Sequence, residues 1–243
     1  APQPSAPQPS APQPSAPQPS APQPSAAAPQ PSAPPFSLAS ASALGGQREL
    51  RLAYVRGPFN RANVRLEVRP RPPKQKQLFD EMAAVARAYP GQAGIVYALT
   101  ADDAEAVAKA LMWREVKAAW FHAGLAEEGL SRLRQAWVAG GQQVLVATAD
   151  FVPAFDSPVV RFALHATMSM SLEAYYQEAG RAGRDGHPSV AVVWWHHRDF
   201  WRLARRAAAS KDRRAAVAQL NLAGKYCEAS TCCRRASVAA LYD

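Results

Sequence analysis

The chain of 243 residues carries 28 Lys or Arg and 19 Asp or Glu, which gives a formal net charge of +9. No apolar run approaches the ~18 residues that cross a bilayer, so we expect no contact with a membrane. The three cysteines, two of them adjacent, fit a disulfide framework poorly and favour a reducing compartment.

Residues 1–46 are rich in Pro, Ala and Ser, open with a repeated APQPS pentapeptide and contain no charged residue. Such a Pro-dense repeat cannot bury a core, so we predict a disordered, extended tail. It has neither the basic start nor the apolar centre of a signal peptide. A solvated spacer is favoured over a ligand for Pro-binding modules, because no basic residue flanks the prolines.

Residues 47–75 are predicted to be a basic linker that ends in a strand over 64–68. Residues 48–76 hold nine Lys or Arg against two acids, and a second basic segment, 202–214, holds six against one. Two basic segments around a near-neutral centre favour a polyanionic partner. Ordinary solvated surface charge is the alternative.

Strand and helix patterns alternate over residues 76–196, whereas residues 197–243 are helical only. The apolar run 94–99 is typical of a strand buried on both faces, and Thr100 before two acids is a helix cap. The alternation predicts an α/β lobe, a parallel sheet with helices on both faces. The predicted strands are 64–68, 94–99, 118–122, 143–148, 159–165 and 190–195, and the predicted helices are 76–88, 101–112, 126–139, 171–180, 197–209, 213–226 and 233–241.

Ligands of open parallel sheets bind beyond the carboxyl ends of the strands. The segments at those ends are 100–102, 122–124, 148–150 and 166–168. We therefore expect the candidate site residues to cluster at that edge of the sheet.

The run QEAGRAGRDG at 177–186 places Gln177, Arg181 and Arg184 at i, i+4 and i+7, which is one face of a helix. Guanidinium groups are planar forks of donors that match phosphate oxygens. Gly180 and Gly183 leave room for a ligand or a second lobe. The run therefore favours a polyphosphate site, while an exposed, salt-bridged helix end is the alternative for such a run in isolation.

Over residues 57–243 the chain resembles the second RecA-like lobe of RecQ-family DNA helicases. The segments that carry the resemblance are FNRANVR at 59–65, GIVY at 94–97, FHAGL at 121–125, VLVAT at 144–148, FVPAFDSPVVRF at 151–162, SLEAYYQEAGRAGRDG at 171–186, and YCE with CRR at 226–235. Other helicases share the Q-x-x-G-R-x-G-R core, but the YYQE and GRDG extensions favour RecQ. The resemblance implies one RecA-like lobe at 76–196 and the start of a zinc-binding subdomain at 197–243.

The resemblance implies that Gln177, Arg181 and Arg184 reach ATP across the cleft between two lobes. Arg184 matches the arginine finger, which stabilises charge on the transferring phosphoryl group. Arg181 would couple nucleotide state to lobe closure. Asp156 matches a motif V acid that couples the nucleotide and DNA sites, although Asp-Ser-Pro reads as a turn in any protein.

The resemblance also implies that His122, Gly124 and Thr148 line a track for single-stranded DNA. A hydroxyl and free backbone N–H groups can bind phosphates there without reading sequence. The plainer alternatives are a core histidine at 122 and a strand cap at 148.

The chain departs from the family in three places, of which the first two concern ATP and DNA. It contains no G-x-x-x-x-G-K-[ST] phosphate loop and no D-E-x-H magnesium motif, so we expect ATP and Mg²⁺ to act only once the missing first lobe is supplied. Where the family has F-G-M-G-I-D, residues 151–156 read FVPAFD. Both glycines are lost and Pro153 removes a backbone donor, which argues against full coupling to DNA.

Cys233 matches the first of four cysteine ligands of the family's zinc site. The sequence holds no further cysteine after it, and the adjacent Cys232 gives poor tetrahedral geometry. We therefore expect no bound zinc, with Cys233 as a lone candidate ligand.

We predict the C-terminal lobe of a RecQ-type, ATP-dependent 3′-to-5′ helicase, inactive by itself. It would act on single-stranded or forked DNA in recombination and repair, in the nucleus. One alternative is a non-catalytic nucleic-acid-binding or regulatory module derived from a helicase lobe, which the missing phosphate loop favours. The other is a truncated gene product without a role of its own.

Overall fold

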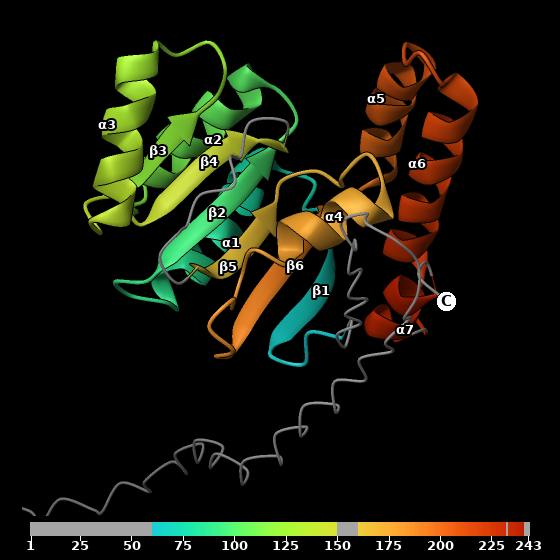
Figure 1. Cartoon of the computed structure of the whole chain (residues 1–243), viewed down its shortest axis with the longest axis horizontal. Helices are drawn as coiled ribbons and strands as arrows, with labels where there is room; N and C mark the ends of the chain where they lie inside the picture. Colours follow the sequence, from blue (N-terminus) through green and yellow to red (C-terminus); the bar gives the residue numbers. More distant parts are fainter. Residues whose placement is uncertain (1–59, 150–159, 232, 241–243) are drawn as a thin grey trace, which may run out of the picture. The chain divides into compact units, whose positions relative to one another are not determined.

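Six strands form one sheet in the order β1-β6-β5-β2-β4-β3, and every neighbouring pair is parallel (Figure 1). This computed structural model describes residues 60–149, 160–231 and 233–240. The strands are β1 Val64–Pro70, β2 Ala93–Ala98, β3 Ala118–Phe121, β4 Val144–Thr148, β5 Val160–His165 and β6 Ser189–Trp195. The expected α/β class and the single parallel sheet are confirmed.

Seven helices are present among the described residues. They are α1 Gln75–Arg87, α2 Ala101–Met112, α3 Glu127–Val138, α4 Leu172–Ala179, α5 His197–Ala208, α6 Arg213–Glu228 and α7 Arg234–Ala239. Each lies within two residues of its predicted range. The Oγ1 of Thr100 accepts a hydrogen bond from the Asp103 N–H at 3.1 Å, so the predicted cap of α2 is confirmed.

The sheet is covered on both faces, as the apolar strand sequences predict. Alternate residues of each strand face opposite sides. On one side they pack against α1 and α2 in a core that contains Met82, Leu111 and Phe162. On the other side they pack against α3 to α7 in a core that contains Trp137, Tyr175 and Leu220. Helices α5 to α7 therefore belong to the face that also carries α4.

All strands point the same way, so the carboxyl ends of the strands share one edge and the amino ends share the other. Helix α4 starts six residues after β5 ends, and the loop after α4 returns to the start of β6. Helix α4 thus carries the chain from the carboxyl edge back to the amino edge. This return decides where the two groups of candidate residues lie.

The described helices contain no segment long and apolar enough to cross a membrane. The predicted tail, residues 1–46, lies outside the described residues, as does the part of the basic linker before residue 60.

Gly94 on β2 lies directly under the ring of Phe162 on β5. A Cβ at this glycine would lie 1.8 Å from the Phe162 Cε2, and the ring is fully buried. We expect Gly94→Ala to lower the free energy of unfolding by about 3 kcal/mol, because the ring cannot move without opening the core. Urea denaturation measures the change.

Gly129→Ala is the matched control, since a Cβ there meets nothing within 4 Å on α3. It should stabilise the chain by ~1 kcal/mol through helix propensity. Equal stability of Gly94→Ala and the wild type would show that the Phe162 ring is free to shift.

Candidate functional site

Helix α4 ends before the arginines of the QEAGRAGRDG run. Its last residue is Ala179, and residues 180–185 form successive turns. The Arg181 N–H bonds the Glu178 carbonyl three residues back, at 3.2 Å, instead of continuing the i to i−4 ladder. The expected single helical face of Gln177, Arg181 and Arg184 is therefore wrong: only Gln177 is helical.

The helix cannot continue because Gly183 has a φ of +62°, a left-handed conformation that glycine adopts without strain. A Cβ at Gly183 would lie 2.5 Å from Asn63 Nδ2 and 2.6 Å from Ser189 Oγ. The space at this glycine is thus filled by the chain itself. The expectation that Gly183 leaves room for a ligand or second lobe is wrong.

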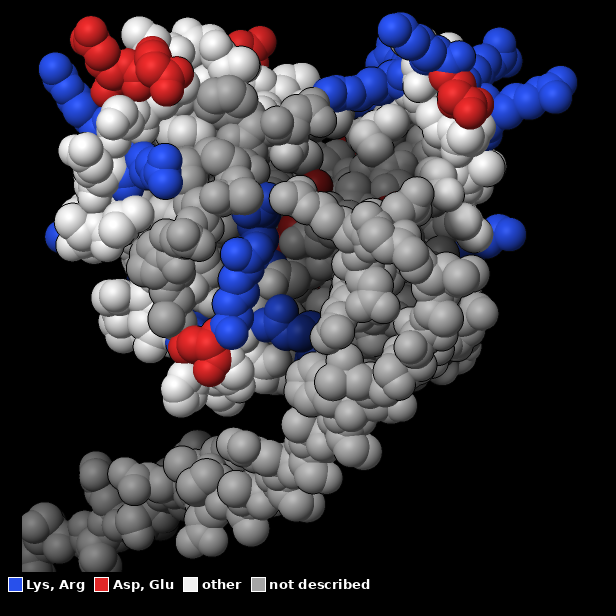
Figure 2. Space-filling view, viewed as in Figure 1, with Lys and Arg blue, Asp and Glu red and all other residues white. Residues whose placement is uncertain are grey.

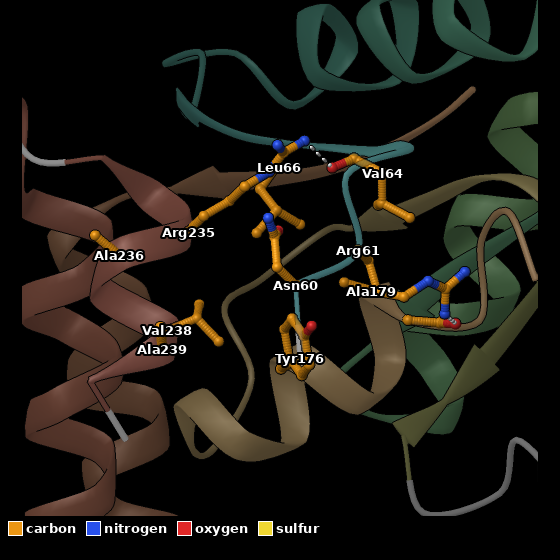
Figure 3. Close-up of a pocket in the computed structure, with 11 residues that line it drawn as sticks. Asn60, Arg61, Val64, Leu66, Tyr176, Ala179, Arg235, Ala236, Val238 and Ala239 are labelled. Atoms are coloured by element: carbon orange, nitrogen blue, oxygen red, sulfur yellow. Dashed lines mark hydrogen bonds between the residues drawn. The ribbon is translucent and has the colours of Figure 1, made fainter. Parts of the chain in front are cut away.

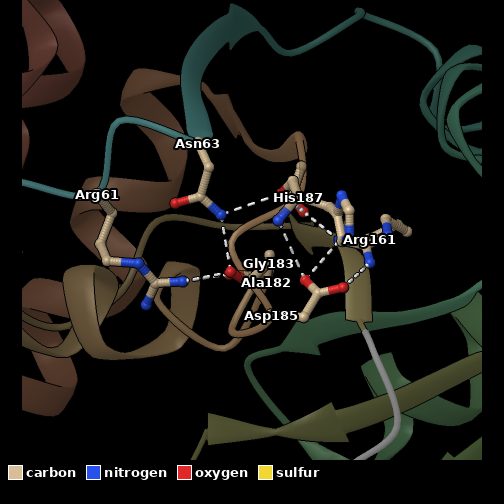
Figure 4. A network of polar contacts seen from close by, with 8 residues as sticks. Arg61, Asn63, Arg161, Ala182, Gly183, Asp185 and His187 are labelled. Atoms are coloured by element: carbon tan, nitrogen blue, oxygen red, sulfur yellow. Dashed lines mark hydrogen bonds and ion pairs between the residues drawn. The ribbon is translucent and has the colours of Figure 1, made fainter. Parts of the chain in front are cut away.

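Arg61 and Asn63 hold the loop of residues 180–187, here called the arginine loop (Figure 4). The Arg61 guanidinium donates to the carbonyls of Gly180 at 3.2 Å and Gly183 at 2.6 Å. The Asn63 side chain donates to the same Gly183 carbonyl at 2.7 Å and to the His187 carbonyl at 3.0 Å. Both residues precede β1, more than 115 positions earlier in the chain, and their role was missed by sequence reasoning. The F-x-R-x-N pattern at 59–63 was the available signal.

Arg161 of β5 holds the far side of the arginine loop. Its guanidinium forms a two-pronged ion pair with Asp185, one arm of which is Nη1 to Oδ1 at 2.9 Å, and also donates to Ser189 Oγ at 3.1 Å. This hydrogen-bonded guanidinium lowers the pKa of Asp185 from 3.8 to about 2. The GRDG tail is therefore a loop held by a charged pair.

The two candidate arginines differ in exposure, since Arg181 is half-buried and Arg184 is exposed, although the charges of both act on the Tyr97 hydroxyl. Arg181 lies near the Tyr97 hydroxyl on β2 and acts to lower its pKa, and this hydroxyl donates to the Glu178 carbonyl at 3.3 Å. Burial raises the pKa of Tyr97, and the charge of Glu178 adds to this, so the hydroxyl stays protonated. Arg184 is exposed and forms no hydrogen bond or ion pair with a described residue. The loop thus fixes the backbone of Arg184 and leaves its guanidinium available.

Gln177 is exposed and its side chain is 3.4 Å from Glu173 Oε1, one turn back on α4. This weak contact does not prevent a phosphate from taking the amide donor. Gln177, the third predicted member of the group, therefore lies on the same segment as the arginines, but in the helix rather than in the loop that follows it. Asp156 lies outside the described residues.

Glu178, next to Gln177, is a buried acid that sequence reasoning missed. Its Oε2 contacts His165 Nε2 at 2.9 Å and accepts a hydrogen bond from Ser169 Oγ. His165, the last residue of β5, stacks on the Tyr97 ring with centroids 4.7 Å apart. The signal was the buried stripe of α4, since Glu178 follows Tyr175 by three positions. These contacts join the carboxyl end of β5 to the last turn of α4.

The other candidates, His122, Gly124 and Thr148, lie at the carboxyl edge. Thr148 ends β4 and is half-buried. The His122 ring is 6% exposed, and its Nδ1 accepts a hydrogen bond from the Gly124 N–H at 3.2 Å. Glu105 Oε1 lies 3.5 Å from the other ring nitrogen. His122 is thus a buried side chain with partners inside the lobe, and the expected free N–H at Gly124 is wrong, because the ring uses it.

The candidates form two groups at opposite edges of the sheet. The Gly183 N–H donates to the carbonyl of Val160, the first residue of β5, at 2.8 Å. The arginine loop is therefore at the amino edge, whereas Thr148 is at the carboxyl edge. The expectation that all candidates cluster at the carboxyl edge is therefore wrong for the backbone of the arginine loop, although Arg181 reaches toward Tyr97, next to the carboxyl end of β2.

A cavity of about 310 Å³ lies between β1, α4 and α7, lined by Val64, Tyr176 and Val238 among others (Figure 3). The Arg235 guanidinium at its rim donates to the carbonyls of Ala62 at 2.8 Å and Val64 at 3.1 Å. Arg61, also at the rim, uses its donors on the arginine loop. The cavity is apolar and is unsuited to a phosphate.

The cysteines do not form a metal site in the described part of the chain. Cys233 is exposed before α7, where backbone N–H groups of Ala236 and Arg235 lower its pKa. Cys227 is buried, which raises its pKa to about 12 and keeps it a neutral thiol. No group of three His, Cys, Asp or Glu side chains is placed to hold a metal ion among these residues, so they do not fit a zinc site.

The sequence of this chain is similar to those of known helicases. A family model described as "Helicase conserved C-terminal domain" matches residues 74–186. The chain is 33% identical over 186 residues to ATP-dependent DNA helicase Q1 of Rattus norvegicus, covering 76% of this chain and 30% of the relative. It is 34% identical over 183 residues to RecQ-like DNA helicase BLM of Xenopus laevis, covering 73% and 13%. The chain thus spans less than a third of either relative.

Among solved structures, the crystal structure of the E. coli DEAD-box protein SrmB bound to RraA is similar to this chain, with a TM-score of 0.49. The two are 18% identical in sequence, and the match covers 58% of this chain and 84% of that one.

Gly183→Ala tests how tightly the arginine loop is held. The new Cβ would be strained by the positive φ and would overlap Asn63 and Ser189, so we expect a loss of roughly 3 kcal/mol in unfolding free energy. Gly91→Ala is the control, because Gly91 has a φ of +70° with nothing within 4 Å. It should cost only about 1 kcal/mol, and equal losses would contradict the close packing.

Asp185→Asn tests the pair with Arg161 through pH. The pKa of Asp185 is lowered from 3.8 to about 2 in the folded chain, so the pair stabilises the fold fully above 3.8 and loses its effect as pH falls toward about 2. We expect Asp185→Asn to destabilise the chain at neutral pH and to approach the wild type only as pH falls below about 2. Urea unfolding across this range measures it.

The same substitution should have no further effect in an Arg161→Gln background. A pH-independent loss, or a full loss in that background, would assign the stability to something other than the pair.

Proposed function

Because the chain carries a helicase C-terminal domain of the RecQ type, we propose that it forms the second RecA-like lobe of an ATP-dependent DNA helicase. The observation that carries the proposal is the placement of Arg184. Its backbone is held by contacts from Arg61, Asn63 and Arg161, while its guanidinium has no described partner.

Arg184 is proposed to act as an arginine finger on ATP bound between this lobe and a first lobe. When water attacks the γ-phosphoryl group, negative charge is spread over the transferring oxygens. A guanidinium held in place stabilises that charge without reorganising at the moment of reaction. The arginine loop supplies this preorganisation through backbone carbonyls that are already bound.

Arg181 and Gln177 are proposed to couple the presence of bound nucleotide to the rest of the lobe. Arg181 lies near the Tyr97 hydroxyl, so a phosphate that attracts Arg181 would compete with a contact to the centre of the sheet. Gln177 would add an amide donor from α4. Mg²⁺ would be held by ATP and the first lobe, because the described residues offer no cluster of carboxylates for it.

DNA is proposed to lie along the carboxyl edge, near Thr148. The fine detail, namely 3′-to-5′ movement on single-stranded or forked DNA in nuclear recombination and repair, follows the family. Glu178 and His165 connect this edge to the last turn of α4. Through these two residues, a DNA strand at one edge and ATP at the other would act on the same helix, α4.

A second candidate is a nucleic-acid-binding module without catalysis. It is favoured by the bond between His122 and the Gly124 N–H, which removes one expected donor from the track. In this case the lobe would bind DNA without coupling it to ATP.

The test joins residues 57–243 to the first lobe of the Q1 relative in place of that protein's own second lobe. DNA-stimulated ATP hydrolysis is expected, and Arg184→Ala should lower it by at least about 10³-fold, the usual contribution of an arginine finger. Arg87→Ala, at an exposed arginine on α1, is the control and should keep the full rate.

Full turnover by the Arg184→Ala chimaera would contradict the assignment of the finger. Salt-dependent DNA binding without any turnover by the parent chimaera would favour the second candidate.

A further inference from the structure

Helix α5 presents an outward row of Arg198, Trp201 and Arg205, here called the α5 stripe. The three residues follow one another at i, i+3 and i+7, so they share one side of the helix. Trp201 is 63% exposed. Arg198 and Arg205 are exposed and their side chains bond no described residue.

The neighbouring arginines of the same helix are already engaged. Arg202 pairs with Asp103 at the start of α2, at 3.1 Å, and Arg206 donates to the Leu99 carbonyl at 3.3 Å. At the start of α5, Asp199 is buried, and both of its carboxylate oxygens accept hydrogen bonds from Arg71 Nη1 at 2.9 Å. These contacts anchor one side of α5 to the lobe and leave the stripe to face solvent.

The surroundings of the stripe are strongly positive. Lys and Arg side chains gather over the end of the α5–α6 pair in Figure 2, where Lys211, Arg213 and Arg214 follow the stripe in sequence. Asp212, the acid within this basic segment, accepts a hydrogen bond from the Ala215 N–H as the cap of α6. Glu228 lies 3.4 Å from His197 at the other end of α5. The field therefore suits a polyanion.

The stripe combines two guanidiniums with a flat aromatic ring, which is the combination that binds single strands. Arg198 and Arg205 are separated by about 10 Å along the helix axis, so the two guanidiniums can bind different phosphates of one strand. An acidic peptide would pair with the arginines but would offer no π-face to Trp201. The exposed indole thus favours nucleic acid.

The position of α5 agrees with this partner. Leu99, bonded by Arg206, directly follows β2, whose last residue Ala98 pairs in register with Thr148. Helix α5 therefore stands at the carboxyl edge, where DNA is proposed to run. The basic segment 202–214 runs on from this position, through the second half of α5 to the start of α6.

We propose that the α5 stripe is a contact site for single-stranded nucleic acid, with Trp201 stacking on a base and Arg198 and Arg205 binding phosphates. This inference rests on the proposed function and extends its DNA path from the sheet edge onto α5.

The test measures binding of fluorescein-labelled oligothymidine to the full chain by anisotropy over a salt series. Trp201→Ala should weaken binding about tenfold, the scale of one stacked base, whereas Trp201→Phe should restore most of it. Arg198→Ala with Arg205→Ala should reduce the slope of log K against log salt by about 1.4, from two lost phosphate contacts. Binding should quench the Trp201 fluorescence.

Matched controls are available on the same chain. Trp113→Ala removes a tryptophan that is 89% exposed at the end of α2, and Arg87→Ala with Arg132→Ala removes the same charge from exposed sites on α1 and α3. These should leave affinity and slope near the wild type. Circular dichroism confirms that each variant is folded.

Unchanged binding in the stripe variants overturns the inference, while the chimaera's ATP hydrolysis would still stand. Equal losses in stripe and control variants, or equal binding of an oligoglutamate, would show a general cation effect and also overturn it. A wild-type chain that does not bind oligothymidine would also contradict the proposed role of the α5 stripe. The proposed role of Arg184 would then still be tested separately, by ATP hydrolysis in the chimaera.

Discussion

The carbonyl of Gly183 is the point on which the candidate site depends. It accepts hydrogen bonds from Arg61 and Asn63, and the N–H of the same residue donates to Val160 at the start of β5. A residue with a positive φ, bonded on both sides, sets the direction in which the chain leaves α4. Arg184 follows directly, so its exposure is a consequence of how Gly183 is held.

Helix α4 connects the two edges of the sheet that carry candidate residues. Near its end the buried carboxylate of Glu178 contacts His165 of β5, and Arg181 lies near the Tyr97 hydroxyl of β2. A buried carboxylate without partners would be costly, so these contacts constrain the helix strongly. Movement of Arg181 toward a ligand would have to break a contact with the centre of the sheet.

Periodicity predicted the helices and strands closely, because buried strands and amphipathic helices leave patterns in the sequence that do not depend on remote contacts. The Thr100 cap is also local, since its hydroxyl bonds an N–H three residues on. The expected helical face of Gln177, Arg181 and Arg184 failed, because Arg61, Asn63 and Ser189 surround Gly183 from outside the motif. The Gly124 N–H was misjudged for a local reason, since the His122 ring, two residues earlier in the chain, folds back and accepts it.

By itself, the sequence determined the α/β class and the order of elements and singled out Arg181 and Arg184 as candidates for binding phosphate, since residue type and short-range spacing carry that information. The tertiary structure alone decided that Arg181 is half-buried and Arg184 exposed, and that the backbone at Gly183 lies at the amino edge whereas Thr148 lies at the carboxyl edge. Those outcomes depend on contacts between residues more than a hundred positions apart, such as Arg61 with Gly183. No local pattern encodes which carbonyls a distant guanidinium will reach once the parallel sheet has formed.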